Sequence, residues 1–457
     1  MTDRLRIALA QTAPTAALAG NVAVLRDAWD RARGMGADLV LAPRFALAGW
    51  PCGDLPRRAD VRAACDAALE DLAALTAGGG PGLVLGGPWA DAGRLHDALF
   101  LLDGGRIVAR RARHAIRPGE CFDPGPAPGP VAFRGIRLGL MCGEDGEDPA
   151  AAETLAETGA ELLLCLHADP FAIGRAARRV QEAVARVVET GLGFLVLNGV
   201  GGLDEAVCDG GSFALNPDRS LAVQLPRFEA ELVLTDWRRG QDGFACLPQP
   251  LAPDCGAEEE IWRALVLFLR GFGDGAVRVG PSGDAGAALL ATLAADALGP
   301  ARVRAVAADD EPGLTLSALD RTAALLGFGG AGGDVAPFRH LMRGQVLALA
   351  RWRNANRPAG LLGPEGPVVP EELLAARPAA LAGLPDDAAL DAVLEALFDR
   401  GETPSGIAPA LLADLSRRLA AAEAARRRAP PGLLVARHQA GREPRYPLIP
   451  FRTDLDS

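Results

Sequence analysis

The sequence predicts a layered α/β fold over its first 240 residues, followed by a linker and a second, smaller α/β domain. Short apolar runs alternate with stretches of helical periodicity, and a strand, a glycine-rich loop and a helix follow one another near residues 277–298. Hydrophobic residues make up 49% and charged residues 23% of the 457 residues, which excludes wholesale disorder. At about 150 residues per domain, this length suggests two or three domains.

Apolar runs bounded by turn residues predict the strands of the first half. Asp103-Gly104 and Arg134-Gly135 mark two hairpins among them. Helical spacing of apolar residues predicts helices from residue 21 to the glycines at 34 and 36, over 150–158 and over 175–189. The predicted strands cover 6–10, 39–42, 83–85, 98–102, 107–109, 131–133, 137–141, 162–166 and 194–198.

Residues 241–258 carry proline and glycine without any periodicity, and we interpret them as an inter-domain linker between domains at 1–240 and 259–457. A helix is predicted to begin at residue 259. The pattern then predicts a strand over 277–279, a loop over 280–286, a helix over 287–298 and a strand over 302–306.

Charge and composition exclude several classes of function. The net charge of −11 gives no general attraction to nucleic acid or anionic lipid. All 47 basic residues are arginine, so Schiff-base chemistry and lysine general bases are excluded. The five histidines and eight cysteines lack zinc-site spacing, so no metal is expected. Without a signal peptide or a long apolar span, we expect a cytoplasmic protein with reduced thiols.

The segments IALAQ, GADLVLAP, ALAGWPCGDL, GAELLL, VVETGLGFLVLNGVGG and DGGSFALNPD occur in this order. In order and spacing they resemble the nitrilase-type glutaminase domain of glutamine-dependent NAD synthetases, over residues 5–237. The resemblance implies a four-layer αββα sandwich. It also implies a pocket where a cysteine attacks the glutamine amide, a glutamate acts as general base and a lysine stabilises the oxyanion.

All three positions of that pocket are altered in this chain. Arg44 takes the glutamate position in the run PRFALAGWP, and a guanidinium cannot act as a base. His114 takes the lysine position, three residues before the run RPG, and Gly143 takes the cysteine position in the run LMCGED. Cys142 lies one residue early, so we expect it to point to the other face of the strand as a core thiol. It is a residual nucleophile only if the strand end twists.

Two interpretations of the altered pocket stay open. Arg44, His114 and Arg117 could make it basic and able to hold an anion or a carboxylate. Alternatively, Arg44 pairs internally with Glu144 or Glu120, and we favour this second interpretation.

The loop GPSGDAG, between a strand and a helix, is typical of a phosphate cradle. It resembles the pyrophosphate loop Ser-Gly-Gly-Ile-Asp-Ser of the synthetase domain. Ser282 and Gly283 match, whereas Asp284, Gly286 and Ala287 depart from the pattern. The aspartate that helps to hold the metal–ATP complex is thereby lost, and Asp284 puts a carboxylate where pyrophosphate would bind. We interpret Asp284 as the N-cap of the helix that follows.

The region over 307–330 is much shorter than the adenylate-binding and substrate-binding segments that the family carries there. Family-like segments resume at GDV and QVLALARWRN and continue to RYPL, which holds Tyr446. The resemblance therefore implies a shortened, doubly wound α/β synthetase-like domain that keeps its helical scaffold and its tail.

The resemblance and the altered residues together predict a catalytically inactive relative that acts as an assembly or regulatory subunit. We expect a homo-oligomer, or a hetero-oligomer with an intact paralogue, without nucleic-acid or membrane partners. No cofactor is expected; ATP and Mg would bind only if the synthetase site works. Two alternatives stay open: a residual ATP-dependent NAD synthetase that uses ammonia or glutamine, and an anion or small-molecule sensor in the former glutaminase pocket.

Overall fold

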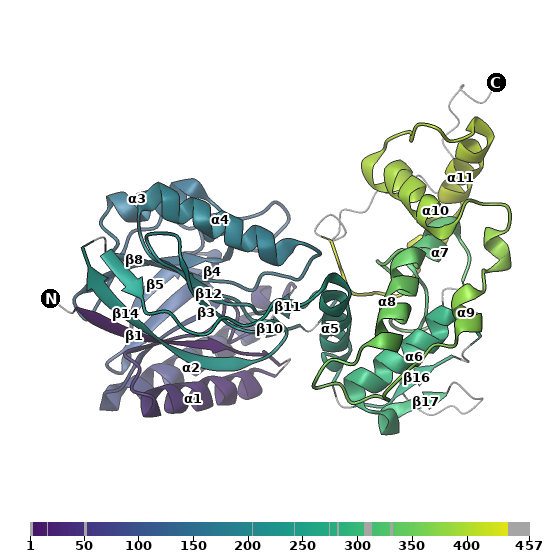
Figure 1. Ribbon diagram of the computed structural model, residues 1–457. Coiled ribbons are helices and arrows are strands. Elements are labelled where there is room, and N and C mark those ends of the chain that lie inside the picture. The colour runs from purple at the N-terminus through teal and green to yellow at the C-terminus, as the bar shows by residue number, and fades with distance from the viewer. Residues whose placement is uncertain are drawn as a thin grey trace. The chain divides into compact units, whose positions relative to one another are not determined.

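A computed structural model places the chain in two compact units, residues 1–254 and 255–457, each of which is described by itself (Figure 1). The structure describes residues 3–15, 17–49, 53–202, 204–241, 243–273, 275–280, 283–305, 313–329 and 332–436.

Two sheets stack face to face in the first unit, and helices cover the outer face of each (Figure 1). The first sheet contains β15 (Gly243–Cys246), β14 (Glu231–Gly240), β1 (Arg4–Gln11), β2 (Leu39–Leu41), β3 (Gly82–Asp91), β4 (Arg94–Asp103) and β5 (Arg106–Ala112), in that order. The second contains β13 (Leu221–Gln224), β12 (Phe213–Leu215), β9 (Phe194–Leu197), β8 (Leu162–Leu166), β7 (Ile136–Cys142) and β6 (Val131–Phe133). A small ribbon pairs β10 (Val200–Gly201) with β11 (Cys208–Asp209).

Helices α1 (Leu18–Gly34) and α2 (Ala59–Leu75) pack on the first sheet, and α3 (Pro149–Glu157) and α4 (Arg175–Thr190) pack on the second. The predicted four-layer αββα sandwich is confirmed. Helix α2 was not predicted, nor were strands β12 to β14.

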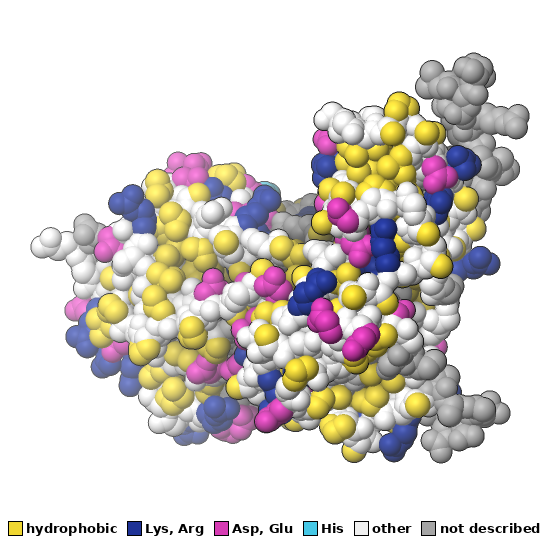
Figure 2. Space-filling view, turned by 45° about the vertical axis from the view of Figure 1, so that its right-hand side comes forward, with side chains coloured by type: hydrophobic (Ala, Val, Ile, Leu, Met, Phe, Trp, Pro, Cys, Tyr) yellow, Lys and Arg dark blue, Asp and Glu magenta, His cyan; other side chains and the backbone are white. Residues whose placement is uncertain are grey.

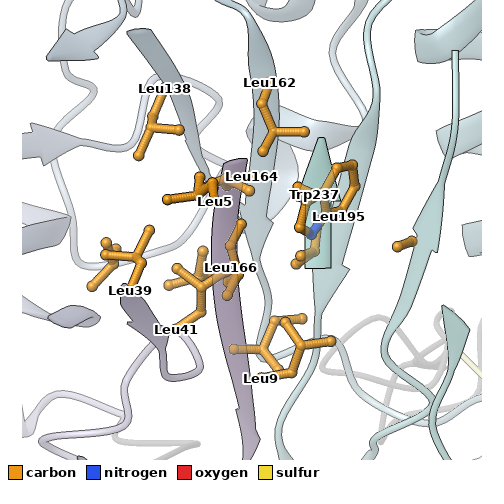
Figure 3. Packing of buried hydrophobic residues seen from close by; sticks show 14 of the residues in the cluster. Leu5, Leu9, Leu39, Leu41, Leu138, Leu162, Leu164, Leu166, Leu195 and Trp237 are labelled. Carbon is orange, nitrogen blue, oxygen red and sulfur yellow. The ribbon is translucent and has the colours of Figure 1, made fainter. Parts of the chain in front are cut away.

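The core between the sheets follows from the alternation of side chains along each strand. On β1, Leu5 and Leu9 point between the sheets, while Ala8 faces the helices. Figure 3 shows the leucines of β7 and β8 meeting those of β1 and β2 in this layer. Because both faces of these strands are buried, their sequences are continuous apolar runs rather than alternating ones.

The linker prediction for 241–258 is corrected at both ends. Residues 243–246 form β15, which pairs antiparallel with β14 and buries Phe244 and Cys246. Helix α5 already begins at Ala257, and the compact units divide after residue 254. This strand has only four residues, beside a tight turn in a segment rich in glycine and proline. Its alternation of buried and partly buried side chains is too short to be recognised in the sequence.

The second unit has a short parallel sheet in the order β17 (Val303–Ala305), β16 (Val277–Val279) and β18 (Leu314–Leu316). This agrees with the predicted shortened α/β domain. Its helices are α5 (Ala257–Arg270), α6 (Ala285–Leu298), α7 (Arg321–Leu326), α8 (Arg343–Ala355), α9 (Glu371–Ala375), α10 (Asp387–Leu394), α11 (Pro409–Ala421) and α12 (Glu423–Arg426).

One buried carboxylate joins three of these helices. Asp296 of α6 accepts hydrogen bonds from Trp262 Nε1 of α5 at 3.0 Å and from Arg353 Nε of α8 at 2.7 Å. Both Asp296 and Arg353 are fully buried. Removing either partner would leave an uncompensated buried charge, which costs about 3–5 kcal/mol.

The surface agrees with the composition. On the face shown in Figure 2, acidic and basic side chains are interspersed and do not separate by sign. Among the described helices, none is both long and apolar enough to cross a membrane.

Asp320 provides a test of the second unit. Its Oδ1 accepts from Ala323 N at 2.7 Å and caps α7, and burial raises its pKa to about 7. Because the folded pKa exceeds the unfolded one, its carboxylate reduces stability progressively as pH rises from about 4 to 7. Asp320→Asn keeps a capping side chain, so we expect it to be more stable than the wild type at pH 8, by at most about 4 kcal/mol, and not at pH 4.

Urea unfolding at several pH values measures this difference. The control is Asp386→Asn, because Asp386 caps α10 through Ala389 N at 2.9 Å but is exposed. Asparagine there changes the same kind of cap without removing a buried carboxylate. A pH-independent effect of Asp320→Asn would contradict the prediction.

Candidate functional site

The structure brings positions 44 and 143 together. Strand β7 ends at Cys142 and turns at Gly143, whose φ of +54° lies in the left-handed region that favours glycine. A Cβ placed on Gly143 would lie 2.6 Å from Nη1 of Arg44, which follows β2 in the other sheet. A side chain at position 143 would therefore point at Arg44, as a facing nucleophile and base require.

Arg44 is buried and held by carboxylates. Its side chain is 6% exposed, its Nε donates to Asp97 Oδ2 at 2.6 Å, and its Nη1 donates to Glu144 Oε2 at 3.0 Å. Burial lowers the pKa of Arg44, but Asp97 and Glu144 more than offset this and raise the pKa above its ordinary value. The pairing with Glu144 that we favoured is present, and Arg44 keeps its proton.

A second arginine, absent from the sequence predictions, lies in the same cluster. Arg113 follows β5, and its side chain is 0% exposed. Its Nε lies 2.9 Å from Asp97 Oδ2, its Nη1 contacts Glu144, and its Nη2 contacts Glu120. Arg44 and Arg113 thus share both Asp97 and Glu144. We call these four residues the charge cluster.

The prediction for His114 is corrected. Its Nδ1 lies 2.9 Å from the Gly125 carbonyl oxygen, and its backbone N–H donates to Asp145 Oδ1 at 2.9 Å. The ring is thus held at the Gly125 carbonyl, while the neighbouring Arg113 enters the cluster. Adjacent residues of an extended chain point to opposite sides, so an error of one residue in register exchanges the two side chains.

The predicted anion pocket is occupied by the chain's own carboxylates. Arg117 is 36% exposed, and its Nη2 lies 3.1 Å from Glu144 Oε1 and 3.5 Å from Glu147 Oε1. Arg44 and Arg117 therefore converge on Glu144, and His114 does not join them. Burial by itself raises the pKa of Glu144, but the arginines around it lower that pKa to about 2.

The free space beside the charge cluster is small. Arg44, Pro43, Ala168 and Cys208 contribute to the lining of a cavity of about 10 Å³. That is roughly the volume that one water molecule needs. An amide substrate would have to displace side chains to enter it.

Cys142 lies away from this space. Its side chain is fully buried in the core between the sheets, together with Leu138 and Leu140 of the same strand. Burial raises the pKa of Cys142 well above its ordinary value, so the thiol stays protonated and a poor nucleophile.

The structure also shows a cysteine–histidine contact that the sequence analysis did not single out. Cys165 Sγ lies 3.2 Å from His167 Nε2 and 3.5 Å from the Gly143 carbonyl oxygen. Burial raises the pKa of Cys165 well above its ordinary value and lowers that of His167 to about 4. Both groups are therefore neutral at pH 7, and the thiol supports the turn beneath Gly143.

The loop of the second unit is described from Gly283 onward, and Ser282 lies outside the described residues. Asp284 Oδ1 accepts from Ala287 N at 2.8 Å, and a Cβ on Gly286 would lie 3.3 Å from the same oxygen. The carboxylate of Asp284 thus caps α6. It occupies the helix N-terminus that a phosphate would use.

Gly143→Ala tests the approach of Arg44 to position 143. We expect a loss of stability of about 1–2 kcal/mol from the left-handed backbone and a further 1–3 kcal/mol from overpacking against Arg44. Chemical denaturation measures the loss. Gly104→Ala is the matched control, because Gly104 has φ +59° and nothing within 4 Å of an added Cβ. Equal losses in the two variants would contradict the geometry.

Glu144→Gln tests the charge cluster. Since the folded pKa of about 2 lies below the unfolded value of 4.5, the stabilisation is complete above pH 4.5 and is lost as pH falls toward 2. We expect the variant to be less stable than the wild type at pH 7, by about 3 kcal/mol at most, with the gap closing in acid. Glu402→Gln, which breaks the exposed pair with Arg400, is the control and should change stability much less, because solvent screens that pair. A gap that stays constant down to pH 2 would contradict the prediction.

Comparisons with known proteins agree with this architecture. The carbon-nitrogen hydrolase family model matches residues 6–241, more than half of the chain. The glutamine-dependent NAD(+) synthetase of Rhodobacter capsulatus is 40% identical over 317 residues, which cover 67% of this chain and 57% of that protein. The synthetase of Xanthomonas campestris is 27% identical over an alignment of 554 residues, which covers 97% of each chain.

The fold is shared beyond the first unit. The glutamine-dependent NAD+ synthetase from Acinetobacter baumannii, solved in complex with ADP, superposes with a TM-score of 0.74 at 20% identity, over 97% of this chain and 98% of that one. The match to the Rhodobacter relative spans little more than half of that protein's length. The chain belongs to the carbon-nitrogen hydrolase family and is a relative of the glutamine-dependent NAD(+) synthetases.

Proposed function

We propose that this chain is a non-hydrolysing relative of the glutamine-dependent NAD(+) synthetases that acts in assembly or regulation. The observation that carries the proposal is the contact between positions 143 and 44. Gly143 offers no side chain, and the group that faces it is the guanidinium of Arg44, ion-paired with Asp97 and Glu144.

Amide hydrolysis through a thioester needs a thiol, a base to take its proton and a cation or donor for the oxyanion. Position 143 supplies no thiol. Arg44 stays protonated and cannot be the base. Arg113 could stabilise an oxyanion by its charge, but Glu144 and Glu120 already accept from its Nη1 and Nη2, and Asp97 pairs with its charge.

No neighbouring thiol is a plausible substitute. Cys142, Cys165 and Cys208, which lines the cavity beside Arg44, are all buried, and burial raises the pKa of each thiol well above its ordinary value. Cys142 belongs to the core between the sheets, and Cys165 to the core beneath the helices of the second sheet. Neither could reach an amide at position 143 without rearrangement of its strand.

The synthetase-like unit supports the same proposal. Asp284 caps α6 with the carboxylate that would face pyrophosphate, and like charges at that distance repel. ATP and Mg are therefore not expected to bind there. The alternative is a residual ligase, and the similarity to the Xanthomonas synthetase along 97% of both chains is what favours it.

The cores are intact while the reactive positions differ, which is the pattern of a fold kept for its shape. We propose that the chain works as a homo-oligomer or together with an intact paralogue. Its regulatory signal would come from a ligand bound near positions 44 and 143, rather than from turnover of a substrate.

The first test is AMP release from ATP and nicotinic acid adenine dinucleotide, with glutamine or ammonium as nitrogen donor. We expect no release above the blank with either donor, because both reactive centres lack their groups. The Rhodobacter relative is the positive control. Turnover with ammonium would contradict the proposal for the second unit, and turnover with glutamine would contradict it for the first.

If glutamine is turned over, two serine variants identify the thiol. Cys142→Ser would abolish the reaction if Cys142 were the nucleophile after a twist of the strand end. Cys121→Ser, which changes a partly exposed thiol in the adjoining loop, should leave it unchanged.

A further inference from the structure

An irregular segment crosses the charge cluster. Residues 114–125, which we call the strap, connect β5 toward β6 without helix or strand. Both ends are tied by backbone hydrogen bonds: Ala115 N donates to Asp145 Oδ1 at 2.8 Å, and Gly125 N donates to the Arg113 carbonyl at 2.7 Å. The far end of the strap is thus tied back to residue 113, next to its near end.

Side chains hold the middle of the strap. Glu120 pairs with Arg113, and the ring of Phe122 lies 5.8 Å from that of Phe45. Arg117 adds its pair with Glu144 at 3.1 Å. Opening the strap over residues 116–122 would break these ion pairs, the ring contact and the hydrogen bond from Cys121 Sγ to the Gly53 carbonyl at 3.7 Å. Asp123, whose N–H donates to the Leu95 carbonyl of β4 at 2.7 Å, would stay in place.

The three carboxylates that contact Arg113 differ in their exposure and in the element that carries them. Asp97 is 0% exposed on β4 and Glu144 is 16% exposed beside β7, whereas Glu120 is 27% exposed on the strap. Glu120 also reaches both terminal nitrogens of Arg113: Oε2 contacts Nη2, and Oε1 lies 3.5 Å from Nη1. This is the fork by which a guanidinium binds a free carboxylate. Glu120 is therefore the partner most easily exchanged.

We propose that Arg113 is a carboxylate-binding site, that Glu120 is its internal ligand, and that a small free carboxylate replaces Glu120 when the strap opens. The exchange keeps the number of charges around Arg113 constant, so no buried charge is left uncompensated. The inference rests on the proposed function, because it names the ligand class to which a non-hydrolysing centre responds. The position of the strap would be the signal.

Competition with Glu120 sets the apparent affinity of Arg113 for a free carboxylate. A tethered carboxylate has an effective concentration in the millimolar range or above, so the wild type responds only to high concentrations of a free carboxylate. Without the tethered group, the same site is open at lower concentrations. Chloride cannot form the two-oxygen fork and should not substitute.

Thermal unfolding of Glu120→Ala and Glu120→Gln in sodium acetate, against sodium chloride at equal ionic strength, tests the site. Both variants remove the charge, but alanine vacates the space while glutamine fills it. We expect a saturable rise in Tm of about 3 °C with acetate for Glu120→Ala only. No acetate-specific rise in Glu120→Ala, or an equal rise in both variants, would overturn the proposal.

The wild type provides a second readout, which does not depend on the folding of a variant. Cys121, next to Glu120 and partly exposed, should be alkylated by iodoacetamide faster in acetate than in chloride, while buried Cys65 is unchanged. Equal rates at Cys121 would overturn the exchange. Glutamine turnover, by contrast, would overturn the proposed function and leave these results interpretable.

Discussion

Two guanidinium groups share two carboxylates inside the first unit, and the local structure around position 143 depends on this arrangement. Arg44 and Arg113 are almost completely removed from solvent, and Asp97 contacts both. Removing the fully buried Asp97 would leave an uncompensated buried charge, at a cost of about 3–5 kcal/mol. The cluster is therefore stable when all four residues are present and unfavourable when one of them, Asp97, is removed. A glutamate at position 44 would place a third carboxylate beside Asp97 and Glu144.

The cluster also explains why glycine occupies position 143. A side chain there would meet the guanidinium of Arg44 at 2.6 Å, and the backbone is left-handed. Glycine at position 143 thus leaves room for the guanidinium of Arg44, and a larger side chain there would have to displace that guanidinium.

In the second unit, the contacts that hold the helices together involve other residues than the cap at the start of α6. Asp296 ties α5, α6 and α8 together through Trp262 and Arg353, so the helical framework is held from inside. At the start of α6, Asp284 satisfies the helix N-terminus with its own carboxylate. The carboxylate of Asp284 thus accepts from a backbone N–H of the first turn that would otherwise be open to an anion.

The sequence by itself determined the order of most strands and helices, the permanent charge of Arg44, the missing side chain at 143 and the cap by Asp284, because each depends on neighbours within a few residues. Only the tertiary structure decided that Asp97 lies under Arg44, that Arg113 rather than His114 enters the cluster, and that 243–246 closes the sheet edge. Arg44 and Asp97, 53 residues apart in sequence, meet because β2, β3 and β4 lie side by side in one sheet, which local periodicity does not encode. The side that a residue of an irregular segment faces is likewise set by its distant contacts.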